Sequence, residues 1–204
     1  MRDWLKLPLI AVCRLFVLPT VFAYRFTALF VDADKAFHGA SQRASLWPGL
    51  FGEYRRREFY RLTLDECAGD CCLSFGMILS KRHARIGRRV YVGTHCNLGL
   101  VTLEDDVLLA SNVDVLSGSG QHHFADPDTP VREQGGEFKR VTIGFDTWIG
   151  NRTVVMADVG SRCVVGAGSV VTGMLPDRSV AVGVPARVVG ARGAEAERAE
   201  ECRA

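Results

Sequence analysis

Two adjacent histidines are the residues of this sequence best suited to moving a proton. His122 and His123 stand in the segment Gln121-His122-His123-Phe124 and form the only adjacent pair among the five histidines of the chain. A neutral imidazole accepts a proton near pH 7, because the ordinary pKa of histidine is about 6.5. The pair is therefore a candidate general base, while two solvated loop histidines without a catalytic role are the simpler alternative.

Polar sequence containing several glycines and prolines surrounds this pair from residue 117 to residue 140. Asp126, Asp128 and Glu133 in the same segment could hold an imidazole in one tautomer, although Asp-Pro and Thr-Pro steps are also ordinary turn formers. Such a segment predicts a loop, and loops displaced from a rigid scaffold are where binding and catalytic residues concentrate. The rest of the chain must then supply the scaffold.

A period of six residues runs through the sequence on both sides of this loop. The apolar positions are Ile86, Val92, Leu98, Leu103, Leu109, Val115, Ile143, Ile149, Val155, Val159, Val165 and Val171. A small or acidic residue usually follows each one, as expected where the backbone bends into a tight turn. Short strands separated by such turns predict an all-β triangular coil, in which the apolar residues point inward and stack from turn to turn. The short spacing between Val155 and Val159 predicts a tightened corner.

The length of 204 residues suits one main domain with an accessory segment. We expect residues 81–190 to form the coil, with residues 117–140 extruded from it as the loop. Residues 1–80 form an apolar, helical N-terminal segment, and residues 191–204 form a charged tail.

The N-terminal segment is almost wholly apolar or aromatic over residues 5–31, where Lys6, Arg14 and Arg25 interrupt it. Its charge-free stretch, residues 15–24, is shorter than the roughly 20 apolar residues that a spanning helix needs. No small-residue cleavage site of a signal peptide follows. We expect either a helix lying in a membrane interface with its arginines at the headgroups, or a helix packed on a partner subunit.

Charge and cysteine content narrow the class of protein further. The 25 basic and 23 acidic residues nearly cancel, so no nucleic-acid partner is expected. The seven cysteines have no metal-ligand spacing, and their odd number argues against a closed set of disulfides. These features predict a cytoplasmic protein that needs no metal, with peripheral attachment to the inner face of the membrane as an extension of that prediction.

Three motifs make the sequence resemble the hexapeptide-repeat acetyltransferases, similar to the galactoside, maltose and colanic-acid enzymes. They are Thr147-Trp148-Ile149-Gly150-Asn151, Val165-Gly166-Ala167-Gly168-Ser169-Val170-Val171-Thr172 and Val182-Gly183-Val184-Pro185-Ala186-Arg187-Val188. The resemblance extends over residues 86–189. It implies a left-handed parallel β-helix, a homotrimer, and acetyl-CoA bound in the groove between neighbouring coils.

The resemblance also assigns roles to single residues. Part of the family has its histidine where Gly120 stands here, whereas other relatives keep Gln-His followed by an aromatic residue, as at His122. His122 is accordingly the predicted general base, with His123 as the second choice and with Asn97 and Asp126 at the acceptor. The implied coenzyme A contacts are Trp148, Asn151, Ala167, Thr172 and Arg187, with Arg192 as a further phosphate contact.

The expected reaction is transfer of the acetyl group of acetyl-CoA to a hydroxyl of a sugar or polysaccharide precursor, directly and without an acyl-enzyme. Two alternatives stay open: N-acetylation of a nucleotide-linked amino sugar, and a catalytically silent trimeric scaffold. A zinc enzyme similar to the γ-type carbonic anhydrases is disfavoured, because it needs three histidines that converge. His38, His83 and His95 lie before the loop, while the remaining two histidines are adjacent to each other.

Overall fold

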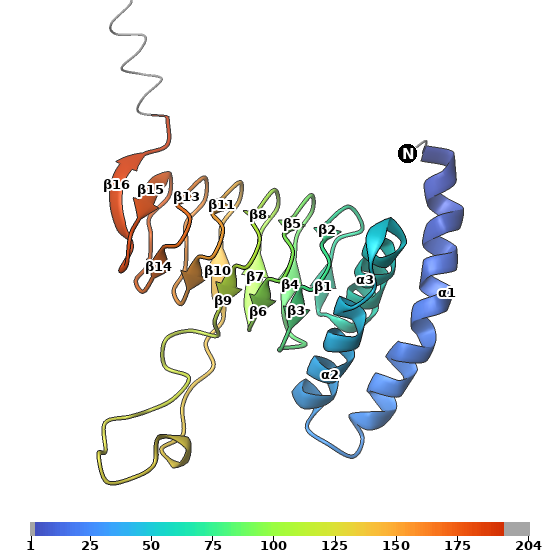
Figure 1. Cartoon of the computed structure of the whole chain (residues 1–204), viewed down its shortest axis with the longest axis horizontal. Helices are drawn as coiled ribbons and strands as arrows, with labels where there is room; N and C mark the ends of the chain where they lie inside the picture. Colours follow the sequence, from blue (N-terminus) through green and yellow to red (C-terminus); the bar gives the residue numbers. More distant parts are fainter. Residues whose placement is uncertain (1–2, 194–204) are drawn as a thin grey trace, which may run out of the picture.

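The computed structural model describes residues 3–193, which form three α-helices and then sixteen short strands, with one 3-10 helix (Val131–Glu133) between the ninth and tenth strands (Figure 1). The helices are α1 (Asp3–Thr27), α2 (Ala33–Ser45) and α3 (Gly49–Thr63). The strands are β1 (Glu66–Cys67), β2 (Cys72–Leu73), β3 (Ile78–Leu79), β4 (Arg85–Ile86), β5 (Tyr91–Val92), β6 (Asn97–Leu98), β7 (Val101–Leu103), β8 (Leu108–Leu109), β9 (Asp114–Val115), β10 (Val141–Ile143), β11 (Trp148–Ile149), β12 (Val154–Val155), β13 (Val164–Val165), β14 (Val170–Val171), β15 (Ser179–Val182) and β16 (Arg187–Ala191).

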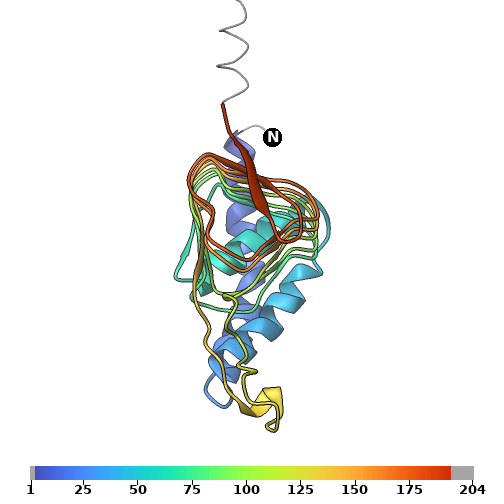
Figure 2. The same ribbon diagram turned by 90° about the vertical axis from the view of Figure 1, so that its left-hand side faces the viewer.

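The strands wind into a coil with three faces, and Figure 2 views this coil end-on, down its axis. Sheet A contains β1, β4, β7 and β10; sheet B contains β2, β5, β8, β11, β13, β15 and β16; sheet C contains β3, β6, β9, β12 and β14. Each strand except β16 pairs in parallel with the strand one turn away, as Trp148 does with Leu108 and Val164. The predicted parallel β-helix is confirmed.

The core of the coil is a set of apolar columns along its axis. Six positions predicted to point inward are all buried: Leu103, Leu109, Ile143, Ile149, Val165 and Val171. In sheet B, for example, Leu109 is in register with Ile149 and Ile149 with Val165. Each turn therefore buries its apolar side chains against those of the next turn, which is the main source of stability in a stacked coil.

The glycines of the repeat serve close stacking between turns. A Cβ atom on Gly93 would lie 2.6 Å from the backbone of Ala110, and one on Gly150 would lie 2.5 Å from the amide nitrogen of Ala167. The left-handed backbone at the corners is supplied mainly by other residue types, such as Asp106 with φ 62°. The bend was expected at the small or acidic residue directly after each strand, whereas Asp106 stands three residues after Leu103.

The coil begins at Glu66, upstream of the predicted boundary at residue 81. Cys67, Leu73 and Leu79 continue the six-residue spacing into the first turn, and Leu73 and Leu79 are fully buried. At the opposite end, β16 pairs antiparallel with β15 and so closes sheet B with a strand of reversed direction.

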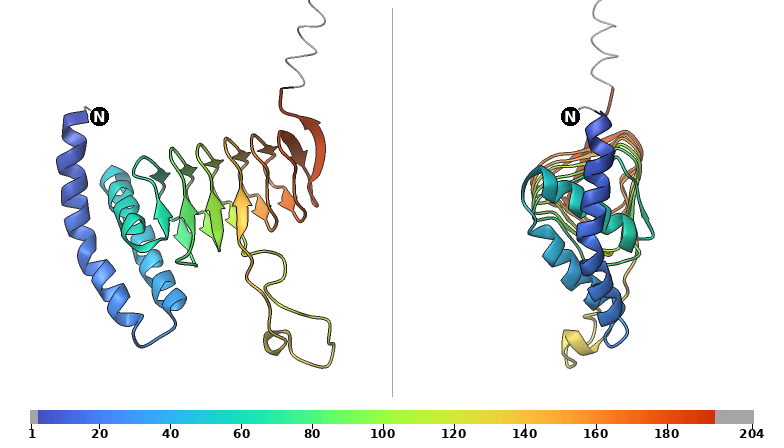
Figure 3. Two further views of the ribbon diagram at one scale, coloured as in Figure 1. Left: turned by 180° about the vertical axis from the view of Figure 1, so that it is seen from behind. Right: turned by 90° about the vertical axis from the view of Figure 1, so that its right-hand side faces the viewer.

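Helices α2 and α3 lie on the first turn of the coil, and α1 lies across them (Figure 3). The buried guanidinium of Arg56 joins these layers, because it donates hydrogen bonds to the carbonyl oxygens of Leu73 (2.8 Å), Trp47 (2.8 Å) and Ala44 (3.3 Å). Because these three hydrogen bonds satisfy the buried guanidinium, Arg56 fixes the position of α3 relative to the coil.

Helix α1 corrects two expectations about the N-terminal segment. Its residues Pro8–Thr27 form one helix that is long enough and apolar enough to cross a membrane, so the count of apolar residues in 15–24 was too narrow. Its two exposed arginines also bind α3 instead of reaching away from the protein. Arg14 pairs with Glu58 of α3 at 2.8 Å, and Arg25 donates to the carbonyl oxygen of Leu62 at 3.3 Å.

Candidate functional site

The extruded loop leaves the coil after β9 and returns at β10, at the corner between sheets C and A (Figure 1). Backbone hydrogen bonds join its two arms: Lys139 donates to Ser117 (2.9 Å), Glu137 to Gly120 (2.8 Å) and His123 to Gly135 (3.0 Å). The arms therefore form a short antiparallel ladder that extends from the coil to the histidine pair.

Gly136 fixes the backbone at that pair. A Cβ atom at this position would lie 1.9 Å from the carbonyl oxygen of Gln121 and 2.9 Å from the amide nitrogen of His122, so only glycine fits. Gly136 was not predicted from the sequence, where its one signal is the Gly135-Gly136 doublet inside a polar loop. Its close contact with Gln121 and His122 sets the register of the loop.

The tip of the loop is held by the side chain of Gln134. Its amide nitrogen donates to the carbonyl oxygens of Asp126 and Thr129, both at 2.7 Å, and its amide oxygen accepts from the Asp126 backbone at 3.1 Å. The Asp126 carboxylate accepts from the Thr129 hydroxyl (2.7 Å) and from the Asp128 amide (2.9 Å). These bonds, the Thr129 hydroxyl first, hold the pKa of Asp126 below its usual range.

Within the single chain, the imidazoles of His122 and His123 are both exposed to solvent. Among residues 3–193, no hydrogen bond joins either imidazole to Asp126, Asp128 or Glu133, and the Glu133 carboxylate accepts from Arg132 instead. The loop thus presents two accessible imidazoles on a backbone held by hydrogen bonds. In the part of the chain that the structure describes, the Asp126 carboxylate accepts hydrogen bonds within the tip of the loop and none from the imidazoles.

A hollow of about 270 Å³ lies at the root of the loop. Its lining comes from both arms and from two turns of the coil: Gly118, Ser119, Lys139, Arg140, Val141, Met156, Ala157, Asp158 and Met174. The shortened repeat before Val159 contributes Met156, Ala157 and Asp158 to this wall. The Asp158 carboxylate accepts the amide of Thr142 at 2.7 Å, which ties the short corner to the returning strand. The shortened repeat therefore also forms part of the wall of the hollow at the root of the loop.

Two of the predicted site residues lie on this side of the coil. Asn97 is exposed on β6, in register with Asp114 of β9, the strand from which the loop departs. Thr172 is exposed directly after β14, at the same corner of a later turn. The structure therefore places Asn97 and Thr172 on either side of the loop root along one edge.

The remaining predicted donor contacts lie elsewhere on the coil. Trp148 projects from sheet B, half exposed, into a groove of about 350 Å³ that also contains Arg192. Arg192 donates to the carbonyl oxygen of Asp146 at 2.7 Å and pairs with its carboxylate at 3.0 Å. The structure thus brings Trp148 and Arg192 together, which sequence spacing did not show.

Asn151 and Ala167 occupy the corner between sheets B and C on successive turns. The Asn151 side-chain oxygen accepts from the Ser111 amide at 3.0 Å, so this residue also stitches neighbouring turns together. Arg187 is exposed on β16, in register with Val182. The remaining predicted donor contacts of one chain therefore lie in three places. Trp148 is on the face of sheet B, Asn151 and Ala167 are at the corner, and Arg187 is on the last strand.

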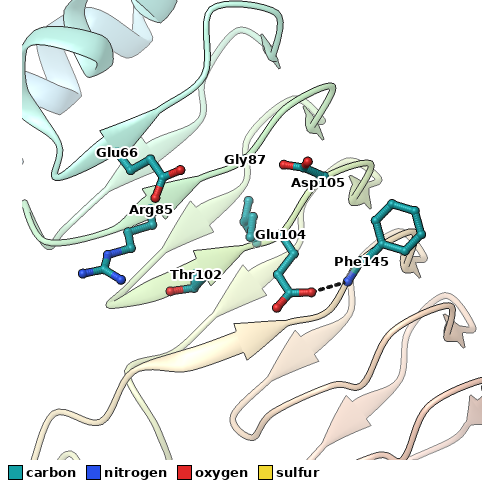
Figure 4. A pocket seen from close by; sticks show the side chains of 8 residues that line it. Glu66, Arg85, Gly87, Thr102, Glu104, Asp105 and Phe145 are labelled. Carbon is teal, nitrogen blue, oxygen red and sulfur yellow. Dashed lines mark hydrogen bonds between the residues drawn. The ribbon is translucent and has the colours of Figure 1, made fainter.

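A further hollow of about 360 Å³ lies on the outer face of sheet A (Figure 4). Its wall holds three acidic residues, Glu66, Glu104 and Asp105, with Arg85 as the one basic residue among those that line it. The Glu104 carboxylate accepts the amide of Phe145 at 2.8 Å. None of the predicted site residues lines this hollow, so the histidine loop remains the candidate site.

Comparison with known proteins agrees with this architecture. Residues 140–173 match the family of bacterial transferase hexapeptide repeats (six repeats). The predicted resemblance to the hexapeptide-repeat acetyltransferases is confirmed.

Named relatives and a solved structure give the same picture. The chain is 37% identical over 111 residues to the galactoside O-acetyltransferase of Escherichia coli, covering 51% of this chain and 52% of that one. It is 31% identical over 121 residues to the putative lipopolysaccharide biosynthesis O-acetyl transferase WbbJ of the same organism, covering 56% and 60%. A galactoside acetyltransferase in complex with coenzyme A shares the fold, with a TM-score of 0.65 and 24% identity over 82% of this chain and 86% of that chain. This chain spans about a third to three fifths of the length of the curated relatives it matches.

Proposed function

We propose that this protein transfers the acetyl group of acetyl-CoA to a hydroxyl of a sugar or a polysaccharide precursor. The observation that carries the proposal is an exposed histidine pair on a braced loop, projecting from a coil of transferase hexapeptide repeats. The two O-acetyltransferase relatives support the choice of a hydroxyl as acceptor.

His122 acts as the general base in this proposal. Its neutral imidazole accepts the proton of the acceptor hydroxyl while the hydroxyl oxygen attacks the thioester carbonyl carbon. The tetrahedral intermediate then expels the thiolate of coenzyme A, which takes the proton from the imidazolium. No acyl-enzyme forms, and the imidazole ends neutral. Gly136 positions this base by packing against its backbone.

A homotrimer completes the site in the same proposal. One coil leaves Trp148 and Arg192 in an open groove and presents Asn151 and Ala167 at a different corner from Thr172. Acetyl-CoA bound between two coils would meet contacts from both, and His122 of one coil would face the donor groove of the next. Sedimentation should therefore give a trimer, and a fully active monomer would contradict this arrangement.

The decisive experiment is an acceptor screen with purified protein and acetyl-CoA. Acetylated product is detected by mass spectrometry, with His122→Ala as the matched control. An O-acetylated sugar formed by the wild type and lost in the variant is the expected result. Acetylation of an amino sugar at nitrogen would show that the acceptor is an amine and not a hydroxyl. Absence of product and of coenzyme A release with every acceptor would favour the silent scaffold.

A further inference from the structure

Helix α1 carries an unpartnered apolar stripe along its outer surface. Its exposed large apolar side chains, with those of the short segment that follows, are Val12, Leu15, Phe16, Leu18, Phe22, Phe26, Leu29, Phe30 and Val31. The opposite side of the helix, with Cys13, Val17, Val21 and Tyr24, is buried against the other helices. Phe22 is 72% exposed and Phe30 is 73% exposed, which is unusual for phenylalanine in water.

Arg14 and Arg25 of α1 bind partners on α3 and do not extend along this stripe. Arg14 is bound to Glu58, and Arg25 is turned to the Leu62 carbonyl. At the edge of the stripe, the guanidinium of Arg55 lies 4.0 Å from the centre of the Trp47 ring and 5.7 Å from that of Phe16. These cation–π contacts hold a positive charge beneath aromatic side chains, an arrangement suited to the boundary between hydrocarbon and water.

The stripe forms one end of the molecule. Figures 1 and 3 show α1 lying across the end of the coil, with α2 and α3 between them. The buried side of α1 faces these two helices, so the stripe faces away from the coil. A flat surface that covered the stripe would meet the coil end-on.

The distribution of charge selects the kind of surface. Among the described residues, the helical region 3–65 holds nine lysines and arginines against six acidic residues, whereas residues 66–193 hold 13 of each. The end that carries the stripe is therefore net positive, and the coil with its loop carries no net charge. Two copies joined through their stripes would bring two cationic ends together, whereas an anionic lipid surface complements them.

We infer that α1 lies flat in the interface of an anionic lipid bilayer. The coil then projects away from the membrane, with its long axis roughly perpendicular to the bilayer plane. The stripe enters the boundary between headgroups and acyl chains, and Arg55 at its edge meets anionic headgroups. The inference does not depend on the proposed acetyl transfer.

The inner side of α1 explains why the helix lies in the interface and does not span it. The Glu58 side chain is fully buried, and it accepts from Arg14 at 2.9 Å and from Arg61 at 3.0 Å. Withdrawing α1 into the bilayer would carry Arg14 into hydrocarbon and expose the apolar faces of α2 and α3 to water. Lying flat keeps both sets of contacts.

The test is flotation of the full-length protein with phosphatidylcholine vesicles, with and without phosphatidylglycerol. The wild type should float with the anionic vesicles and lose binding at high salt. The double variant Phe22→Ser/Phe26→Ser should bind at least about tenfold more weakly, because two large apolar side chains no longer leave water when α1 binds. Phe124→Ser, at a loop residue that is 78% exposed, is the matched control and should bind like the wild type.

Three results would overturn the inference. The first is a wild type that floats with neither vesicle, or a double variant that floats as well as the wild type. The second is a wild-type complex of two copies that the double variant abolishes in sedimentation, which would make a second copy the occupant. The third is wild-type protein that resists alkaline extraction from membranes, as spanning helices do. A folded coil in the double variant is verified by its cooperative melting, and Leu29→Ser repeats the test should that variant misfold.

Discussion

Ile149 in the coil and His122 in the loop are held in place by different forces. Ile149 is fully buried and lies between Leu109 and Val165 of the neighbouring turns, so its position follows from stacking and strand pairing. His122 is exposed, and its backbone is set by hydrogen bonds between the loop arms and by the contact with Gly136. Stability therefore resides in the coil, whereas the loop can change without unfolding the chain.

The largest expected effect is on the coil. Ile149→Asp places an unpaired charge in an apolar column, at a cost of several kcal/mol against a total stability of about 5 to 15 kcal/mol. We expect no cooperative thermal transition by circular dichroism. The control Trp148→Asp alters the adjacent, outward-facing residue of the same strand and should keep the transition. A cooperative Ile149→Asp protein that melts close to the wild type would refute the stacking argument.

The loop should show the opposite behaviour. His122→Ala should lower kcat by about 10² to 10⁴, the usual contribution of a positioned general base, with the melting temperature and coenzyme A affinity nearly unchanged. His123→Ala should cost much less, and the steady-state kinetics of the two variants compare them directly. If His123→Ala is the inactive variant, the base is the second histidine. If neither changes kcat, the loop is not the catalytic element.

A smaller effect is expected at the glycine that braces the loop. Gly136→Ala should push the returning arm away from Gln121 and lower kcat by about tenfold, because a displacement of roughly 1 Å already misaligns a catalytic group. Melting should stay within about 2 °C of the wild type, since the coil is untouched. Gly120→Ala, in the same loop with open space around it, is the control and should retain wild-type kinetics. Equal activity of both variants would show that the arm contact does not position His122.

The smallest effect belongs to the tip. The pKa of Asp126 is lowered by the Thr129 hydroxyl and the Asp128 amide, so the tip gains order from the ionised carboxylate above the ordinary aspartate pKa, and loses it as the pH falls through the lowered pKa. Asp126→Ala should speed hydrogen exchange at the Asp128 amide near neutral pH with no change in melting. Unchanged exchange would mean that Gln134 alone orders the tip.

The parts that could be predicted from sequence are those set by local periodicity. The inward positions of Leu109 and Ile149 follow from spacing alone, because a stacked coil repeats one environment. The earlier start of the coil was missed because Leu79 and Ile86 are seven residues apart, which breaks the six-residue spacing just before Ile86.

Contacts between segments distant in the sequence were not predictable. The meeting of Gly136 with Gln121 depends on the pairing of the loop arms, and the ion pair of Arg14 depends on Glu58, which is 44 residues away. Trp148 and Arg192 share a groove only because the last strand folds back along the coil.

The reversed last strand has a consequence for how the molecule behaves in a crowded solution. A parallel coil whose final turn were bare would offer unpaired amides and carbonyls to the first turn of another copy, and head-to-tail polymers would grow from it. Here β16 runs antiparallel, with an irregularity in its pairing between Val180 and Ala181, and the first turn is covered by α2 and α3. The helices thus cover the first turn, and the reversed strand removes the parallel edge of sheet B at the opposite end, so stacking of copies head to tail is disfavoured.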